Sequence, residues 1–448
     1  MTAIDESRAT HEHVDTSKVP FAMRDRLHVP RERYYDRAFF ELEKEKLWMR
    51  TWQMACRLEE IPEPNDFIEY EIVDQSVLLI RQPDGSVKAL HNACRHRATQ
   101  LERGTGNLAG GQIVCPFHGW RWNADGSPSF LFGKEGFSPE CLQPQDIRLR
   151  EVKVELWGGC AYINFDADAG PLLEHLSPAD QLLESIGVNN WQVKWWKEGI
   201  LNANWKLAQE AFMEGWHVMA THPQLTMGLG EDFPPANAQY NVYRNGHSNF
   251  QRPGEKASFP SLDILLLAGQ LLADGQDAMT LDRDLYVLEE LRNQLEPGDD
   301  VAARAGQALR EYAEGAGIPW RKDMELNPLF FGSEVFCFPN HFYLPNYGNA
   351  LSYRFRPHND NPEQCRFEIW SLTTYPEVEQ RPRVESLGRF DIDDVDNWGL
   401  IPRQDFSNIE RQQRGLHSQS FEQTRLATEW EGAISNMHFE LDRRLAQD

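Results

Sequence analysis

The spacing of apolar and polar positions changes along the chain. Residues 31–48 place Tyr35, Phe39, Leu42 and Leu47 at near-helical intervals, which predicts a helix ahead of the first domain. From about 50 to 165, short β-type runs such as FIEYEIV, SVLLIRQ, GQIVCPF and CAYINF alternate with the turn signals PDG, GTG, AGG and ADGSP. Such alternation is typical of a small antiparallel β domain.

The pattern becomes mixed from about residue 166 onward. It predicts a helix near 204–219, strands near 334–357 and 366–375, and a C-terminal helix near 418–445, which together indicate an α+β domain. Leucines recur at three- and four-residue steps from Leu281 to Leu295, and Pro297 with Gly298 should end that helix before another begins near Val301. We interpret residues 260–316 as a helical insertion that either packs on the domain or forms a substrate lid or an interface.

Length and charge narrow the classes of function. A chain of 448 residues with 41% apolar content is long enough for two cores, and its net charge of −24 disfavours nucleic acid and membrane surfaces as partners. The most apolar run, 264–273, is too short to span a bilayer, and the N-terminus MTAIDESRATHEHVD has no apolar region typical of a secretory signal. We therefore expect a cytoplasmic protein in which the seven cysteines form no disulfide framework.

Two cysteines lie beside histidines. Cys94 and His96 are separated by one residue, and Cys115 and His118 by two, with 18 residues between the pairs. Thiolates with imidazoles suit either zinc or a Rieske iron–sulfur cluster, but paired zinc ligands are usually separated by two to four residues. The intervening glycines (104, 106, 110 and 111) loosely suggest a dinucleotide loop; without a βαβ unit around them we interpret them as turn residues, so NAD(P)H should bind elsewhere.

A second group of ionisable residues lies in NWKLAQEAFMEGWHVMATHPQ. Glu210, Glu214 and His217 would share one helix face, and His222 follows five residues after His217. A step of five turns a helix by about 140°, so both histidines can reach one metal only if the helix is distorted or ends between them, as Pro223 indicates. The four-residue step of the zinc motif HExxH is absent, and the pattern favours the 2-His-1-carboxylate triad of non-haem iron.

These boxes resemble the Rieske non-haem iron oxygenases, in particular the catalytic (alpha) subunits of aromatic-ring-hydroxylating oxygenases. CRHR and CPFHGW look like the family's two cluster-ligand loops, the His217 segment looks like its mononuclear-iron helix, and IPRQDFSNIERQQRGLHS looks like the box that supplies the last ligand. The resemblance implies a [2Fe-2S] cluster whose inner iron is held by the cysteines and whose outer iron is held by the histidines. The implied ligands are, for the cluster, Cys94, His96, Cys115 and His118 and, for the mononuclear Fe(II), His217, His222 and Asp405.

The same resemblance implies the architecture. We expect an N-terminal helical segment (1–48) that packs on the catalytic domain, an antiparallel β Rieske domain (49–165), and an α+β catalytic domain of helix-grip type (166–448) into which the Rieske domain is inserted. The family is typically a homotrimer, or an assembly with a beta subunit. Glu214 would carry electrons to the mononuclear iron from the cluster of the adjacent subunit.

The expected activity is hydroxylation, single or double, of a small organic substrate. O2 is the oxidant, and electrons come from NAD(P)H through a separate reductase or ferredoxin. An aromatic or other hydrophobic substrate is favoured by Phe212, Trp216, Phe336, Phe338, Phe342 and Tyr343.

Two alternatives stay open. Glu214, where many members have Asp, and the box QQRGL resemble the branch that oxidises quaternary amines such as betaine or carnitine. Ala211, where many members have Asn, also departs from the naphthalene-type pattern. The other alternative is a Rieske electron carrier without catalytic activity.

Overall fold

The computed structural model describes residues 14–226, 239–251, 261–319, 334–346, 348–376, 384 and 386–447. The chain divides into two compact units: a smaller unit, Trp48–Leu172, and a larger unit formed by Met1–Leu47 and Leu173–Asp448. In the described residues no helix is both long and apolar enough to cross a bilayer. None of the seven cysteines, all of which are described, forms a disulfide bond.

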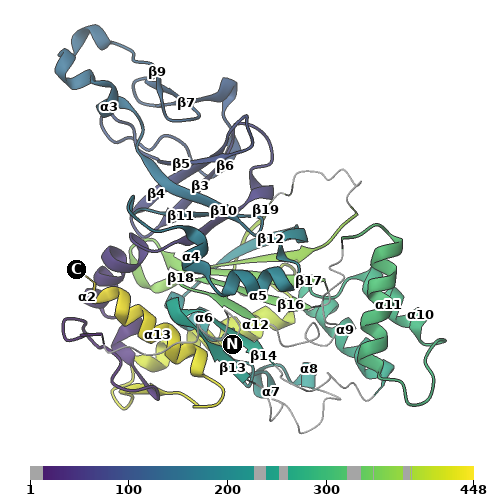
Figure 1. Ribbon diagram of the computed structural model, residues 1–448. Helices are drawn as coiled ribbons and strands as arrows, with labels where there is room; N and C mark the ends of the chain where they lie inside the picture. Colours follow the sequence, from purple (N-terminus) through teal and green to yellow (C-terminus); the bar gives the residue numbers. More distant parts are fainter. Residues whose placement is uncertain are drawn as a thin grey trace. The chain divides into compact units, whose positions relative to one another are not determined.

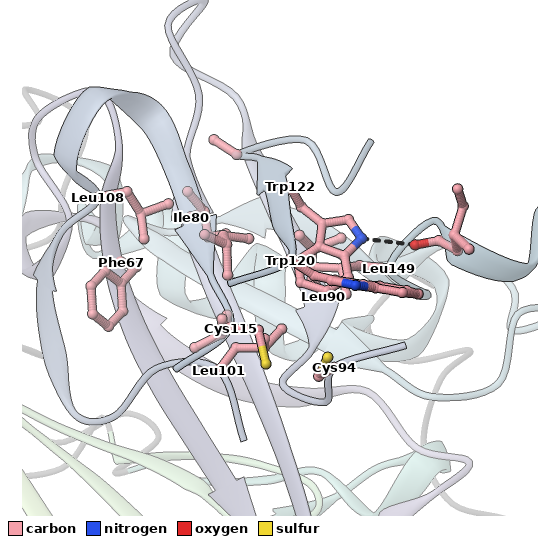
Figure 2. Close-up of a cluster of buried hydrophobic side chains, with 14 residues drawn as sticks. Phe67, Ile80, Leu90, Cys94, Leu101, Leu108, Cys115, Trp120, Trp122 and Leu149 are labelled. Atoms are coloured by element: carbon pink, nitrogen blue, oxygen red, sulfur yellow. Dashed lines mark hydrogen bonds between the residues drawn. The ribbon is translucent and has the colours of Figure 1, made fainter. Parts of the chain in front are cut away.

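The smaller unit is an antiparallel β structure, as predicted (Figure 1). Its larger sheet has the strand order β2 (Gln53–Arg57), β11 (Cys160–Asn164), β10 (Glu151–Trp157), β5 (Val87–His91), β4 (Gln75–Arg81), β3 (Asp66–Ile72) and β6 (Thr105–Asn107). A second sheet contains β7 (Gln112–Val114), β8 (Arg121–Asn123) and β9 (Pro128–Phe130). Between the sheets lies an apolar cluster in which the buried indole Nε1 of Trp122 donates to the Ile147 carbonyl at 2.7 Å (Figure 2).

The larger unit is built on an eight-stranded sheet. The strand order is β13 (Gln239–Val242), β14 (Ser248–Gln251), β15 (Val335–Cys337), β16 (His341–Asn346), β17 (Asn349–His358), β18 (Asn361–Thr373), β12 (Gln192–Leu201) and β19 (Ser386–Phe390). All neighbours are antiparallel except β12 and β19. The helix α6 (Trp205–Glu210) packs on β17 and β18, α12 (Leu400–Leu416) packs on α6, and α13 (Gly432–Leu445) packs on β13 and β14 (Figure 1).

The predicted insertion is helical in its described part, residues 261–316. It contains α9 (Leu262–Gln276), α10 (Asp282–Leu291) and α11 (Val301–Gly315), which lie side by side (Figure 1). The leucine pattern misplaced the end of one helix, because α10 ends at Leu291 and not at the proline.

One of the glycines predicted to be a turn residue between the cluster loops, Gly106, lies in strand β6. Gly106 faces the Phe67 ring so closely that a Cβ would lie 3.0 Å from it.

The two predicted terminal helices are also shorter than expected. Residues 31–48 form η1 (Arg31–Tyr34), α2 (Arg37–Leu42) and a π-helical turn η2 (Glu43–Trp48), because the Asp36 side chain caps α2 at Phe39 and starts a new helix. The C-terminal helix begins at residue 432 and not near 418, since β20 (Gln423–Arg425) pairs with β1 (His28–Pro30). Local periodicity cannot reveal a pairing with such a distant strand.

Candidate metal centres

The second group of ionisable residues lies in a loop rather than along one helix. α6 ends at Glu210, and helical structure resumes at α7 (Val218–Thr221), so the predicted continuous helix over 204–219 was wrong. The physical cause is Glu214, whose Oε2 accepts the backbone N–H groups of Trp216 and His217 at 2.7 and 3.1 Å. These bonds compete with helical hydrogen bonding in the residues before α7, whose N-cap is His217.

The helix end that the sequence predicted near Pro223 lies at His222 itself. α7 is one turn long and occupies the residues between the two histidines, His222 follows it with a non-helical backbone (φ −122°, ψ 57°), and Pro223 opens the next short helix, α8 (Pro223–Thr226). This arrangement brings both imidazoles to one carboxylate: Nε2 of His222 lies 2.9 Å and Nε2 of His217 lies 3.8 Å from Oδ1 of Asp405. The nitrogen and oxygen donors of the three residues all lie within 4.8 Å of one another.

Asp405 comes from the inward face of α12. Ile401, Asp405 and Ile409 recur at four-residue steps and are buried, so the carboxylate is carried to the interior by the apolar face of an amphipathic helix. Asp405 is 5% exposed and His222 is 3% exposed, whereas the His217 side chain is partly open.

Each imidazole is held by its other nitrogen. Nδ1 of His217 lies 2.7 Å from Oε1 of Glu214, and Nδ1 of His222 lies 2.9 Å from Oε1 of Gln404. Because both acceptors require an Nδ1–H, the neutral form of each imidazole has its lone pair on Nε2, the ring nitrogen nearest Asp405. Two imidazole nitrogens and one carboxylate of this kind fit a 2-His-1-carboxylate iron site. Sequence reasoning missed Gln404, although it directly precedes Asp405.

The charges around His217 favour its cationic form. Burial alone would lower the pKa of the imidazole, but the hydrogen bond that its ring N–H donates to Glu214 and the negative charges of Glu214 and Asp405 outweigh burial and raise it. A divalent cation would compensate the same two carboxylates. A cavity of about 200 Å³ opens beside the triad, and Glu210, Glu214, His217 and Asp405 are among the residues that line it.

An aromatic cluster adjoins the triad. The Phe212 ring lies 4.4 Å from that of Tyr353, 5.5 Å from that of Phe355 and 5.9 Å from that of Phe367, and Phe367 contacts Phe406, the neighbour of Asp405. Burial, together with the charge of Asp405, raises the pKa of Tyr353 well above its usual range.

Of the six aromatic residues singled out in the sequence, Phe212 and Phe342 join this cluster. Trp216 instead pairs with Trp430 and is half-exposed. Phe336 and Phe338 contact each other, and Tyr343 packs on Trp191.

The segments that contain Cys94 with His96 and Cys115 with His118 form two loops with the same backbone hydrogen bonds. The N–H of Cys94 bonds to the Thr99 carbonyl and that of Cys115 to the Trp120 carbonyl, each at 2.8 Å. The N–H of Ala98 and of Gly119 bonds back to the respective cysteine carbonyl at 2.9 and 3.0 Å. Ala98 and Gly119 both have a positive φ, of 59° and 69°. The two loops are therefore structurally equivalent although their Cys-to-His spacings differ.

Side chains from the two loops converge in pairs. The Cys94 and Cys115 thiols are buried at one edge of the apolar cluster, where Figure 2 shows both sulfur atoms. The Nδ1 atoms of His96 and His118 lie 3.2 Å apart on partly exposed rings. Burial disfavours the Cys115 thiolate, but backbone N–H groups of His118 and Phe117 bond to its sulfur and bring its pKa below the usual value. Two buried sulfurs beneath two outer imidazoles fit a cluster with two unlike irons.

A single zinc ion fits this set less well. In the described part of the chain, three or more donor atoms lie within 4.8 Å of one another at one place, the triad of His217, His222 and Asp405. The four donors of the smaller unit do not meet that one-ion geometry, which leaves room for more than one metal.

Asn92 supports the first loop, because its Oδ1 accepts the N–H groups of Leu101 and Glu102 at 3.0 Å. Sequence reasoning also missed this residue.

Two family models match the chain. Residues 51–130 match the Rieske [2Fe-2S] domain, and residues 185–447 match the catalytic domain of the ring-hydroxylating alpha subunit. The chain belongs to the ring-hydroxylating alpha-subunit family. Membership confirms the resemblance and the α+β architecture with a Rieske domain, and it implies both a Rieske [2Fe-2S] cluster and a mononuclear non-haem iron.

Related proteins differ in what they oxidise. Over 224 residues the chain is 31% identical to the alpha subunit of 2-aminobenzenesulfonate 2,3-dioxygenase of Alcaligenes sp., a match that covers 49% of this chain and 56% of that one. It is 29% identical over 197 residues to the carnitine monooxygenase oxygenase subunit of Acinetobacter baumannii, covering 43% and 52%. The chain thus spans about half the length of the curated relatives it matches. The fold resembles that of a naphthalene 1,2-dioxygenase bound to phenanthrene, with a TM-score of 0.69, 18% identity and coverage of 97% and 96%.

Proposed function

We propose that this chain is the terminal oxygenase component of a Rieske system that hydroxylates a small organic molecule with O2. The observation that carries the proposal is the convergence of His217, His222 and Asp405 beside a cavity. An electron carrier needs a cluster only, and has no use for a second metal site with free coordination positions.

The donor sets support the following ligands. Cys94 and Cys115 would bind one iron of the cluster and His96 and His118 the other, while His217, His222 and Asp405 would bind the mononuclear iron. When bound, the mononuclear iron supplies a place where O2 is reduced next to the substrate. Glu214 and Gln404 hold the two imidazoles in the tautomer that leaves Nε2 free.

The surroundings of the triad favour an aromatic or other hydrophobic substrate. Phe212, Tyr353, Phe355 and Phe367 form an aromatic cluster that adjoins the triad but does not line the cavity of about 200 Å³, so an aromatic substrate would have to enter between the triad and these rings to pack on them. A quaternary amine is the second candidate, since aromatic faces also attract cations and one relative is a carnitine monooxygenase. Dihydroxylation and monooxygenation both stay within the proposal.

Electrons would come from NAD(P)H through a separate reductase or ferredoxin. We further propose a homotrimeric, cytoplasmic enzyme in which Glu214 links His217 to a cluster histidine, His96 or His118, of the adjacent subunit. Its carboxylate already accepts the ring N–H of His217 and keeps lone pairs for a further donor.

The test is product formation by the iron-loaded protein with a reductase, NADH and O2, using naphthalene-like rings and carnitine-like amines as two substrate panels. We expect hydroxylated product from the wild type and none from His217→Ala, with the cluster spectrum and its reduction unchanged. His417→Ala is the control, because His417 is exposed and pairs with Glu363 away from the triad. If His217→Ala forms product at the wild-type rate, or if neither panel gives product, the result favours a Rieske electron carrier without catalytic activity.

A further inference from the structure

A buried carboxyl group next to the iron-binding loop has no role in the ligand set described above. Glu210 is the last residue of α6, is 7% exposed, and lines the same cavity as Glu214, His217 and Asp405. The carboxyl therefore stands between the protein interior and the space next to the triad.

The hydrogen bonds of Glu210 fix the state of its partners. The Tyr34 hydroxyl lies 3.0 and 3.1 Å from the two carboxyl oxygens, and Nε2 of His438 lies 2.9 Å from Oε1. Nε of Arg33 donates to Nδ1 of His438 at 3.1 Å. A guanidinium group has no acceptor, so Nδ1 must accept, and the proton of the neutral imidazole sits on Nε2 and is donated to Glu210. Burial, followed by the charges of Arg33 and Lys206, holds the pKa of His438 well below its usual range.

The cations near Glu210 pair with other carboxylates. Lys206 of α6 lies 2.7 Å from Glu43 of η2, and Arg33 of η1 lies 2.5 Å from Asp442 of α13. The described hydrogen-bond partners of Glu210 are a neutral imidazole and a phenol, and the negative charge of Glu431 raises the pKa of Glu210 further.

The pKa values reflect this distribution of charge. Burial raises the pKa of Glu210 to about 8, and hydrogen bonding from Tyr34 and the charge of Lys206 only partly oppose burial. Glu368 on β18 is equally enclosed, yet Arg354 and Arg356 hold its pKa well below its usual range. Burial raises the pKa of both carboxyls, and the difference between them lies in the two arginines paired with Glu368, which have no counterpart among the described hydrogen bonds of Glu210.

We propose that Glu210 is a proton donor to the cavity beside the iron triad. The proposal rests on the oxygenase function proposed above, since both forms of hydroxylation by O2 consume two electrons and two protons: monooxygenation of R–H yields R–OH and water, and dihydroxylation yields a diol. The electrons come from the reduced donor protein. Glu210 breaks its O–H bond and passes one of the two protons through water in the cavity to the oxygen that is being reduced, and the second proton comes from solvent through the same cavity.

The geometry also provides for the return of the proton. The carboxylate that remains accepts the His438 N–H and the Tyr34 O–H, and it regains a proton from solvent through the cavity before the next turnover. The cavity is polar at this end, with Glu210, Glu214 and Thr424 in its wall.

Glu210→Gln is the discriminating variant. Its amide keeps one acceptor oxygen and donates an N–H where the acid donates its O–H, so it mimics the neutral acid but cannot release a proton. Asp284→Asn is the matched control, because it removes another buried carboxyl whose pKa is raised by burial, and Asp284 lies in α10 and is not among the residues that line the cavity.

The first measurement does not depend on activity. An infrared difference spectrum between wild type and Glu210→Gln should contain the C=O band of one neutral carboxylic acid, which disappears with a midpoint near pH 8 and is present with or without iron. Tyr34→Phe removes a donor that lowers this pKa, so the midpoint should move upward; this variant keeps the test valid if Glu210→Gln folds poorly. If the band is absent at pH 7, or if the midpoint in Tyr34→Phe stays in place, the proposal is overturned.

The second measurement is single-turnover product formation at pH 7. Glu210→Gln should keep its iron and its reducible cluster but form product roughly 10²-fold more slowly, the range typical of a lost proton donor. Asp284→Asn should stay within about threefold of the wild type. Equal rates in wild type and Glu210→Gln overturn the role of Glu210, whereas a wild type that hydroxylates nothing contradicts the proposed function instead.

Discussion

Replacing Glu214 by glutamine tests whether this residue merely orients a ligand or also carries electrons. The carboxylate makes three hydrogen bonds inside its own chain: Oε1 accepts Nδ1–H of His217, and Oε2 accepts the backbone N–H groups of Trp216 and His217. An amide cannot satisfy both sides. If its NH2 faces His217, the imidazole must move its proton to Nε2 and loses the lone pair for iron; if its oxygen faces His217, the NH2 opposes two N–H donors.

The size of the orienting effect follows from these contacts. A hydrogen bond to a charged group contributes about 1.5–3 kcal/mol, and the loss of a partner of a metal-binding histidine typically costs about 10- to 100-fold in affinity or activity. Gln404 provides a matched control, since it accepts Nδ1–H of His222 at 2.9 Å as a neutral group. Gln404→Ala should therefore show an orienting effect of at most this size.

The assay is rapid-mixing reoxidation of the reduced cluster with substrate and O2, at saturating Fe(II) so that both variants are metal-loaded. If Glu214 is the electron link between subunits, Glu214→Gln should slow reoxidation by more than about 10³-fold, beyond the range of orienting residues, while Gln404→Ala stays within that range. A loss in Glu214→Gln that equals the loss in Gln404→Ala, or a rate near that of the wild type, would refute the link.

Two further predictions concern stability. Ala98 has φ 59° in the first cluster loop and Gly119 has φ 69° in the second, where a Cβ would meet nothing within 4 Å. Because a positive φ favours glycine, Ala98→Gly should stabilise the protein by about 0.5–1 kcal/mol, and Gly119→Ala should destabilise it by a similar amount. Chemical unfolding measures both changes. Burial lowers the pKa of His247 from 6.5 to about 4, so the unfolded imidazole binds a proton below pH 6.5 while the folded one does not until about pH 4. Stability should fall by about 3 kcal/mol as the pH drops through that window, because each pKa unit corresponds to about 1.4 kcal/mol. His247→Asn should lose that part of the slope, and an unchanged slope would contradict it.

The proposed metal-binding side chains could be picked out from the sequence where they lie close together along the chain. Cys94 with His96, Cys115 with His118, and His217 with His222 are each within one short segment, so their spacing alone carries the signal. Asp405 is different. A single aspartate gives no local signal, and it was found through the resemblance of the surrounding box to the family.

The contacts that support these residues could not be predicted, because they join distant parts of the chain. Gln404 meets His222 across 182 positions, and Tyr34 meets Glu210 across 176. Secondary structure failed for a similar reason: the α6–α7 break depends on the Glu214 carboxylate binding backbone N–H groups, which competes with a helical pattern that periodicity alone would continue.

Iron and acid-labile sulfide analysis of the purified protein tests the central claim most directly. Two disjoint ligand sets predict about three iron ions and about two sulfide ions per chain. His217→Ala should lose one iron and keep all of the sulfide. One zinc ion per chain without sulfide would contradict the account, as would a wild-type iron content that matches the sulfide content.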